Sequence, residues 1–149
     1  MPCYCPLDGW RHKETNGFTM HPQLAQRDQP LTVPCGQCIG CRLERSRQWA
    51  IRCMHERQMH DESCFITLTY DDDHLPYAGT LVLEDFQKFM KRLRKKVGPV
   101  RFYHCGEYGE ETFRPHYHAL IYGWMPNDKS LFSTSGDHPL YSSSVLSAL

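Results

Sequence analysis

Residues Arg114–Gly123 read RPHYHALIYG, and this stretch determines how the rest of the chain is arranged. Its apolar and aromatic residues, bounded by a proline and a glycine, are typical of a β-strand. Because side chains alternate between the two faces of a strand, His116 and His118 should project from one face, and Tyr117, Ala119 and Ile121 from the other. The stretch therefore predicts a strand with one polar face and one face that packs on a core.

The pair His116 and His118 has the spacing of a metal site, because two imidazoles about 6.5–7 Å apart at their Cα atoms can reach one divalent ion. Just upstream, residues 100–109 (VRFYHCGEYG) predict a second strand, and a polar turn joins the two into a hairpin. The hairpin would bring Glu107 close to the start of the histidine strand. Two histidines and one carboxylate would suit Mg²⁺ or Mn²⁺ that polarises a phosphate oxygen. The alternative is that both histidines are half-buried strand residues without a ligand.

A second candidate metal site lies in the Cys-rich N-terminal segment, residues 1–41. Prolines and glycines interrupt residues 1–34, so we expect mostly loop, which something must hold in place. The candidate ligands are Cys3, Cys5, Cys35, Cys38 and Cys41. The last three follow a Cys-x2-Cys-x2-Cys spacing that forms one tight knuckle, and either of the first two could complete a structural Zn²⁺ site. The alternatives are an iron–sulfur cluster, whose usual spacings differ, and reduced thiols in a turn.

Length and composition limit the class of protein. A chain of 149 residues, 40% of them hydrophobic, is long enough for one domain with a core. No stretch approaches the roughly 18 consecutive apolar residues of a membrane span, and no signal-peptide pattern begins the chain, so we expect it to stay in a cytoplasm. In that compartment eight cysteines indicate metal binding or free thiols rather than disulfides. The formal net charge is zero, so only local patches can attract nucleic acid.

The remaining elements alternate between helix and strand. A helix is expected over residues 42–60, a strand over 63–70, and a second helix with a clean apolar stripe over about 83–96. Together with the histidine hairpin, this order favours an α+β protein in which helices pack on one face of an antiparallel sheet. The first helix carries five arginines, of which Arg45 and Arg52 are candidates for contact with DNA phosphates. A solvated face partly neutralised by glutamates would explain the same pattern.

The residues around the histidine pair resemble a known superfamily. The two histidines with a tyrosine between them resemble the His-hydrophobe-His motif of HUH endonucleases, which initiate rolling-circle replication. Residues 64–70 (CFITLTY) resemble the strand motif that precedes it. The motifs from Pro34–Cys38 (PCGQC) through Gly106–Gly109 (GEYG) to the histidine strand are similar, in the same order, to the replication initiation proteins of gokushovirus-type microviruses. The resemblance covers most of the 149 residues.

The resemblance implies a fold and a reaction. Residues 42–149 would form an HUH endonuclease-like domain, incomplete at its C-terminal end, with a ferredoxin-like sheet and the histidine pair on a central strand. The implied reaction is metal-dependent, site-specific nicking of single-stranded DNA at a replication origin, in which a tyrosine becomes linked to the 5′ phosphate. Partners would be this DNA and the replication machinery of a bacterial host, in whose cytoplasm the protein would act, without membrane contact. Thr67 and Thr69 would border the DNA, and Arg114 is a further candidate for contact with it.

The nucleophile is where this chain departs from the family pattern. In such initiators a tyrosine follows the histidine strand on a helix of the form Tyr-x-x-Lys, or Tyr-x-x-x-Tyr with a following lysine, and neither form is present. Tyr141 is the fallback candidate; otherwise we expect the chain to be the N-terminal part of a longer initiator. Two other functions stay open. One is a non-catalytic, zinc-containing module that binds single-stranded DNA, and the other is a hydrolase that uses the same two histidines and glutamate with an activated water.

Overall fold

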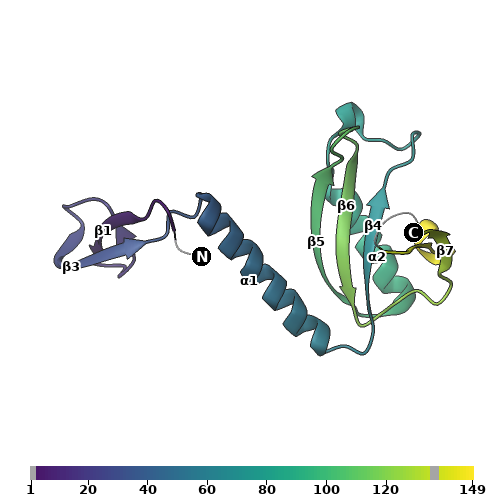
Figure 1. Cartoon of the computed structure of the whole chain (residues 1–149), viewed down its shortest axis with the longest axis horizontal. Coiled ribbons are helices and arrows are strands. Elements are labelled where there is room, and N and C mark those ends of the chain that lie inside the picture. The colour runs from purple at the N-terminus through teal and green to yellow at the C-terminus, as the bar shows by residue number, and fades with distance from the viewer. Residues whose placement is uncertain (1–2, 135–137) are drawn as a thin grey trace. The chain divides into compact units, whose positions relative to one another are not determined.

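The computed structural model describes residues 3–134 and 138–149 and divides into two compact units, residues up to 54 and residues from 55 onward. The first unit contains strands β1 (Leu7–His12), β2 (Phe18–Thr19) and β3 (Ala25–Val33), followed by helix α1 (Ile39–Gln58), which continues into the second unit. The elements of the second unit are β4 (Ser63–Thr69), the 3-10 turn η1 (Tyr77–Gly79), α2 (Leu83–Val97), β5 (Arg101–Tyr108), β6 (Pro115–Tyr122), β7 (Ser130–Ser133), β8 (Leu140–Ser142) and α3 (Ser144–Ser147). The α+β class expected from the sequence is confirmed (Figure 1).

The prediction that residues 1–34 are mostly loop is wrong, because β1, β2 and β3 form an antiparallel sheet in the order β2-β1-β3. Gly9 and Pro30, two of the residues that suggested loop, have defined places in this sheet. Gly9, in the central strand, lies so close to β2 that a Cβ atom there would come within 2.5 Å of the Thr19 carbonyl oxygen. Pro30 lies in the edge strand β3 next to a register shift, where a residue without an N–H group is tolerated.

Strands β4, β5 and β6 form a second antiparallel sheet in the order β4-β6-β5, so the histidine strand β6 is central. The predicted hairpin is confirmed, because β5 and β6 pair directly and align Glu107 with His116. On its other side, β6 pairs with β4, which aligns Thr67 with His118 and Thr69 with His116. The sheet therefore places segments from both neighbouring strands beside the histidines.

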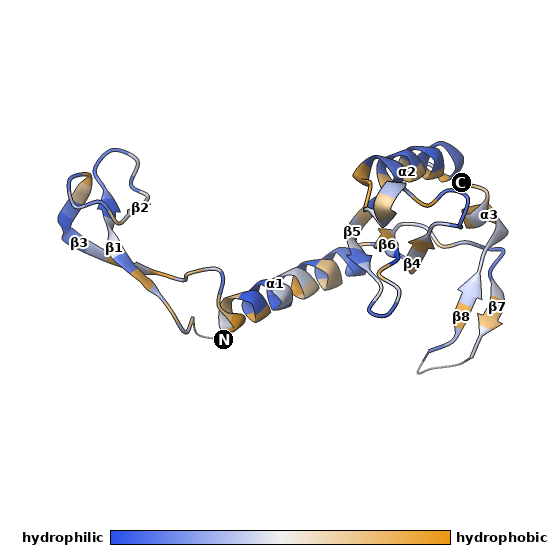
Figure 2. Ribbon diagram, turned by 90° about the horizontal axis from the view of Figure 1, so that it is seen from above, coloured by the Kyte–Doolittle hydropathy of each residue, from blue (hydrophilic) through white to orange (hydrophobic). Residues whose placement is uncertain are grey.

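One hydrophobic core holds this sheet and α2 together. Alternate residues of β6, namely Tyr117, Ala119 and Ile121, are buried on the face that meets α2. The apolar stripe predicted for α2 is confirmed, and its Phe86 and Leu93 are almost completely buried. Burial of a large apolar side chain contributes about 1.5–3 kcal/mol, so this face fixes the register of β6 and leaves the opposite face for the histidines. Figure 2 shows α2 along one side of the sheet, with mostly hydrophilic residues along its ribbon.

The C-terminal segment, residues 145–149, is anchored to the second unit. Leu146 and Leu149 pack against the core of the second unit. The Asp128 carboxylate fixes the start of α3 by accepting hydrogen bonds of 2.6–2.9 Å from two hydroxyls and one backbone N–H in residues 143–145. The strands before α3, β7 and β8, pair with each other as a separate two-stranded sheet.

Helix α1 spans 20 residues, of which only Gly40 is buried. Arginines alternate with scattered apolar residues along it, so it lacks a continuous apolar surface comparable to that of α2. Within the described ranges of the chain, no helix combines the length and the apolar character needed to cross a membrane.

Candidate metal centres

Strands β5 and β6 bring Glu107, His116 and His118 together on the face of the second sheet that points away from α2. The histidines share this face because they are two residues apart on one strand, and Glu107 faces His116 because the two are register partners. This is the set of ligands expected from the sequence. The side chains of His116, His118 and Glu107 are 16%, 25% and 54% exposed, so the group is accessible from solvent.

The ligand atoms of this group converge on one point. His116 Nε2 lies 3.8 Å from Glu107 Oε1, and His118 Nε2 lies 4.0 Å from Glu107 Oε2. Neighbouring ligands about 2.1 Å from an octahedral ion are about 3 Å apart, so the carboxylate would need to move inward by about 1 Å. A half-exposed glutamate can make that movement by side-chain rotation. Two imidazole nitrogens and one carboxylate oxygen therefore fit a divalent ion such as Mn²⁺ or Mg²⁺.

Each histidine is held through its Nδ1 atom. The Arg114 carbonyl oxygen lies 3.1 Å from His116 Nδ1, and because a carbonyl can only accept, Nδ1 carries the proton and Nε2 carries the lone pair of the neutral ring. The Thr67 hydroxyl oxygen lies 3.0 Å from His118 Nδ1 and can accept the same kind of bond. When the Thr67 hydroxyl accepts, both Nε2 atoms carry a lone pair for a metal ion, as in most metal-binding histidines. Sequence reasoning missed this role of Thr67, which is 51 positions away from His118.

Arg114 supports the group with its side chain as well as its carbonyl. Its guanidinium donates to the Tyr70 carbonyl oxygen at 2.6 and 3.2 Å and to the Asp72 carboxylate at 2.7 Å. These bonds tie the turn after β4 to the start of β6, next to the histidines. The DNA contact predicted for Arg114 stays a prediction. Thr69 is exposed and aligned with His116, so it lies on the face where the resemblance implies DNA.

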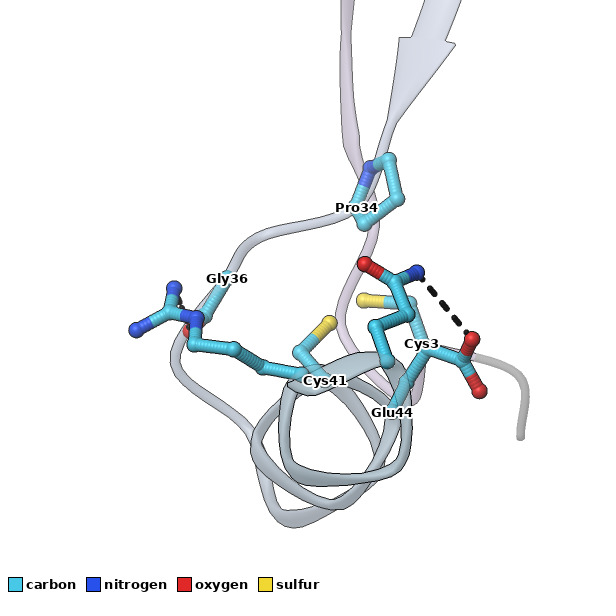
Figure 3. A pocket seen from close by; sticks show the side chains of 7 residues that line it. Cys3, Pro34, Gly36, Cys41 and Glu44 are labelled. Carbon is cyan, nitrogen blue, oxygen red and sulfur yellow. Dashed lines mark hydrogen bonds between the residues drawn. The ribbon is translucent and has the colours of Figure 1, made fainter. Parts of the chain in front are cut away.

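The cysteine cluster forms a second candidate centre, in the first unit. The ligand atoms of Cys3, Cys35, Cys38 and Cys41 lie within 4.8 Å of one another, whereas Cys5 is exposed and outside this group. The Sγ atom of Cys3 is 3.6 Å from that of Cys35 and 3.8 Å from that of Cys38. A disulfide would require about 2.05 Å, whereas four sulfurs about 2.3 Å from a tetrahedral zinc ion are about 3.8 Å apart. Figure 3 shows the sulfurs of Cys3 and Cys41 turned toward each other in a hollow.

Backbone N–H groups point at the sulfurs of this cluster. The N–H of Tyr4 donates to Cys38 Sγ at 3.4 Å, and the N–H of Cys38 donates to Cys35 Sγ at 3.3 Å. These bonds lower the pKa of the Cys38 thiol to about 6 and also lower the pKa of the Cys35 thiol. A backbone bond from Gly36 acts in the same direction on Cys41, but burial and the neighbouring sulfurs outweigh it and raise the pKa of that thiol to about 12. A Zn²⁺ ion among the four sulfurs would offset this effect and hold all four cysteines as thiolates.

The other candidates from the sequence lie elsewhere in the fold. The guanidinium of Arg45 donates to the Gly36 carbonyl oxygen at 3.3 Å, beside the cysteine cluster. Arg52 lies over the ring of Trp49, with its Cζ atom 4.9 Å from the ring centre. Tyr141 is exposed on β8, in a sheet separate from that of the histidines. Roles of Arg45 and Arg52 in DNA binding, and of Tyr141 in catalysis, stay predictions.

Comparison with known proteins places the histidine group in a matched region. Residues 63–143 match a family described as replication-associated protein ORF2/G2P. The chain is 41% identical over 156 residues to replication-associated protein VP4 of Bdellovibrio phage phiMH2K, an alignment that covers 98% of this chain and 49% of the relative. It is 35% identical over 112 residues to replication-associated protein ORF4 of Chlamydia phage 1, covering 72% of this chain and 27% of that relative.

A third relative is replication-associated protein ORF2 of Spiroplasma virus 4, which is 36% identical over 118 residues, covering 70% of this chain and 37% of the relative. The chain thus spans about half, or less, of the length of these curated relatives. No solved structure matches it. The segment that matches the family includes β4, β5 and β6 and therefore all three residues of the histidine group.

Proposed function

The chain belongs to the ORF2/G2P family of replication-associated proteins, and from this membership we propose that it carries the DNA-nicking site of a rolling-circle replication initiator. The observation that carries the proposal is the group of Glu107, His116 and His118 on the open face of a sheet whose central strand is β6. The ferredoxin-like, HUH endonuclease-like fold that the resemblance implies is part of this proposal, and the central place of the histidine strand supports it. The proposal therefore rests on geometry and family together.

In the proposed reaction, a tyrosine hydroxyl attacks one phosphodiester of single-stranded DNA. A bond forms between the tyrosine oxygen and phosphorus, the bond from phosphorus to the 3′ oxygen breaks, and the hydroxyl proton ends on the released 3′-hydroxyl. The 5′ phosphate stays linked to tyrosine, ready for rejoining. Mn²⁺ or Mg²⁺, when bound, would withdraw charge from a phosphate oxygen. His116, His118 and Glu107 would hold the ion on the exposed face, where a phosphate can approach.

The attacking tyrosine is a separate part of the proposal. Tyr141 is the only tyrosine after β6 in this chain, but it lies on a strand and not on a helix, and no lysine follows it. We therefore propose two separable activities. Metal-dependent binding of DNA belongs to the histidine group, and covalent transfer additionally needs a tyrosine that can reach it.

The substrate class and place of action follow from the same proposal. The relatives are replication-associated proteins of phages and viruses of Bdellovibrio, Chlamydia and Spiroplasma, so we propose single-stranded DNA at a viral origin as the substrate. The place of action would then be the cytoplasm of a bacterial host. A nick of this polarity releases a 3′-hydroxyl, which host replication enzymes can extend, so these are the expected further partners.

A covalent trapping assay tests the proposal. The chain is incubated with single-stranded oligonucleotides and Mn²⁺, and the products are separated on denaturing gels. A protein band shifted by attached DNA supports tyrosine transfer, and the shift should vanish in the double variant His116→Ala, His118→Ala. Cleaved DNA without an adduct would point to the hydrolase instead. DNA binding without cleavage would point to the non-catalytic module.

For the first unit we propose a structural Zn²⁺ held by Cys3, Cys35, Cys38 and Cys41. The sulfur separations of 3.6 and 3.8 Å support it, because they match the edge of a tetrahedral site. Structural zinc contributes about 10–16 kcal/mol of apparent binding free energy in small peptides, which is enough to organise a small sheet with few buried residues. One zinc per purified chain, and loss of structure in this unit on chelation, are the expected measurements.

A further inference from the structure

Phe65 is an exposed aromatic residue beside the histidine group. It lies on β4, two residues before Thr67 and on the same face of the sheet, and 62% of its surface is exposed. Its ring stacks on the imidazole of His118, with ring centres 5.2 Å apart and planes inclined by 21°. Part of the ring therefore rests on a candidate metal ligand, and its exposed surface faces the same solvent as the site.

The surroundings of Phe65 favour a small, flat occupant. Thr67 and Thr69, the next residues of β4 on this face, are exposed and polar, and Glu107 lies across the sheet. A protein partner would need about 1,200 Å² or more of total contact surface, whereas one aromatic ring among polar neighbours matches a single planar group. A nucleobase has this size, and its faces stack on aromatic rings whatever its identity.

We propose that the exposed surface of Phe65 stacks with an unpaired nucleobase next to the phosphate held at Glu107, His116 and His118. The inference rests on the proposed function and adds a residue that selects the substrate. Phe65 pairs with Leu120 of β6, so His118, two residues away on that strand, is its diagonal neighbour at about 7–8 Å on the same face. A phosphate at the histidines therefore places an attached nucleoside within reach of the ring.

Stacking on Phe65 determines which form of DNA the site accepts. In a duplex, the faces of each base are covered by the neighbouring base pairs, so they are unavailable to a protein side chain. An unpaired base presents its face to Phe65 while its phosphate lies at the histidine group. The stack of Phe65 on His118 also means that the base completes a three-layer arrangement of base, phenyl and imidazole. The Phe65 stack thereby selects single-stranded over double-stranded DNA, and the stack itself does not read the base sequence.

The test compares DNA affinities of the full chain at saturating Mn²⁺ by fluorescence anisotropy, with an oligothymidylate of about 15 nucleotides. Phe65→Ala should weaken binding about 5- to 100-fold, the usual effect of losing one aromatic–base stack. Phe65→Trp should retain binding, and its added indole fluorescence should be quenched by the DNA. Phe132→Ala is the matched control, because Phe132 is also an exposed strand phenylalanine, 75% exposed on β7, and its removal should leave affinity unchanged.

An oligonucleotide of abasic sites separates stacking from backbone contact. Wild type and Phe65→Ala should bind it with equal affinity, since no base remains to stack. Equal affinity of the two proteins for oligothymidylate overturns the proposal. The proposal is also overturned if Phe65→Ala weakens binding to the abasic strand as much as it weakens binding to oligothymidylate. A dimer of the wild-type chain that Phe65→Ala dissociates, seen by sedimentation, also overturns it, because the ring would then cover a second copy.

A further variant distinguishes failure of this inference from failure of the proposed function. The double variant His116→Ala, His118→Ala should abolish the Mn²⁺ dependence of DNA binding. If the dependence on Mn²⁺ and on the histidines is found but Phe65→Ala has no effect, only the stacking is wrong. If DNA affinity depends neither on Mn²⁺ nor on the two histidines, the proposed function itself is wrong at this site.

Discussion

Replacing Thr67 with valine should weaken Mn²⁺ binding at the histidine group without loosening the sheet. Of the two Nδ1 partners, the Thr67 hydroxyl is the one that comes from a side chain, whereas His116 is held by a backbone carbonyl. Valine keeps the branched shape and the strand preference of threonine, and position 67 is exposed, so the fold should lose little. His118 would lose the acceptor for its Nδ1 proton. Its ring could then rotate, or the proton could move to Nε2, and a protonated Nε2 cannot bind a metal.

The size of the effect can be bounded. Loss of the outer partner of a metal-binding histidine typically lowers metal affinity about 10- to 100-fold. We expect about 10-fold, because water can replace a hydroxyl at an exposed position. This corresponds to about 1.4 kcal/mol, which is within the range for one hydrogen bond. The contribution of His116 should be unchanged, because no side-chain substitution removes its carbonyl partner.

Thr69→Val is the matched control for this prediction. Thr69 lies on the same strand and face as Thr67, is also exposed, and aligns with His116, whose Nδ1 is already bonded to Arg114. Mn²⁺ affinity is measured by the paramagnetic resonance signal of free Mn²⁺ during titration, and thermal denaturation in chelator checks the fold. Unchanged affinity in Thr67→Val would refute the reasoning, as would an equal loss in both variants.

Three further outcomes are expected. Cys3→Ser should reduce bound zinc below one per chain and destabilise the first unit, whereas Cys5→Ser should change neither, as measured by metal analysis and circular dichroism. Burial lowers the pKa of His104, which stacks on Phe86 with ring centres 4.0 Å apart, so the folded state favours the neutral ring. Stability should therefore fall as the pH drops below about 6.5, and His104→Phe should reduce the difference in urea midpoint between about pH 5 and pH 7.5. Asp128→Asn should speed amide hydrogen exchange in α3, because its carboxylate accepts the bonds that fix the start of that helix.

The histidine group could be predicted from the sequence because its parts lie on neighbouring strands joined by a short turn. The two-residue period of β6 places both histidines on one face, and the short connection sets the register that aligns Glu107 with His116. The same period identified the core face of β6. Local pattern is sufficient for these three residues because they are near one another in the chain.

Contacts between distant segments could not be predicted in this way. Thr67 reaches its histidine only because β4 pairs with β6 in one particular register, and a shift of one residue would turn Thr67 to the other face. The choice of Cys3 over Cys5 depends on how the chain returns to the knuckle after 32 residues. Gly9 and Pro30 suggested loop because glycine and proline usually mark turns in the local sequence. In the folded chain, the neighbouring strands determine which residue each of these positions tolerates.

Strand β6 makes the stability of the second unit and the geometry of the histidine group depend on one register. Its odd-numbered residues pack against α2, and Ile121 among them is completely buried, while its even-numbered residues carry the ligands. A slip of one residue would bury both histidines and expose the core residues together. A ligand that binds only the correct register adds its binding free energy to folding, about 2.7 kcal/mol at a concentration one hundred times its dissociation constant. Core packing on one face of β6 and ligand binding on the other therefore favour the same alignment of the strand. A change of register would disrupt both faces together.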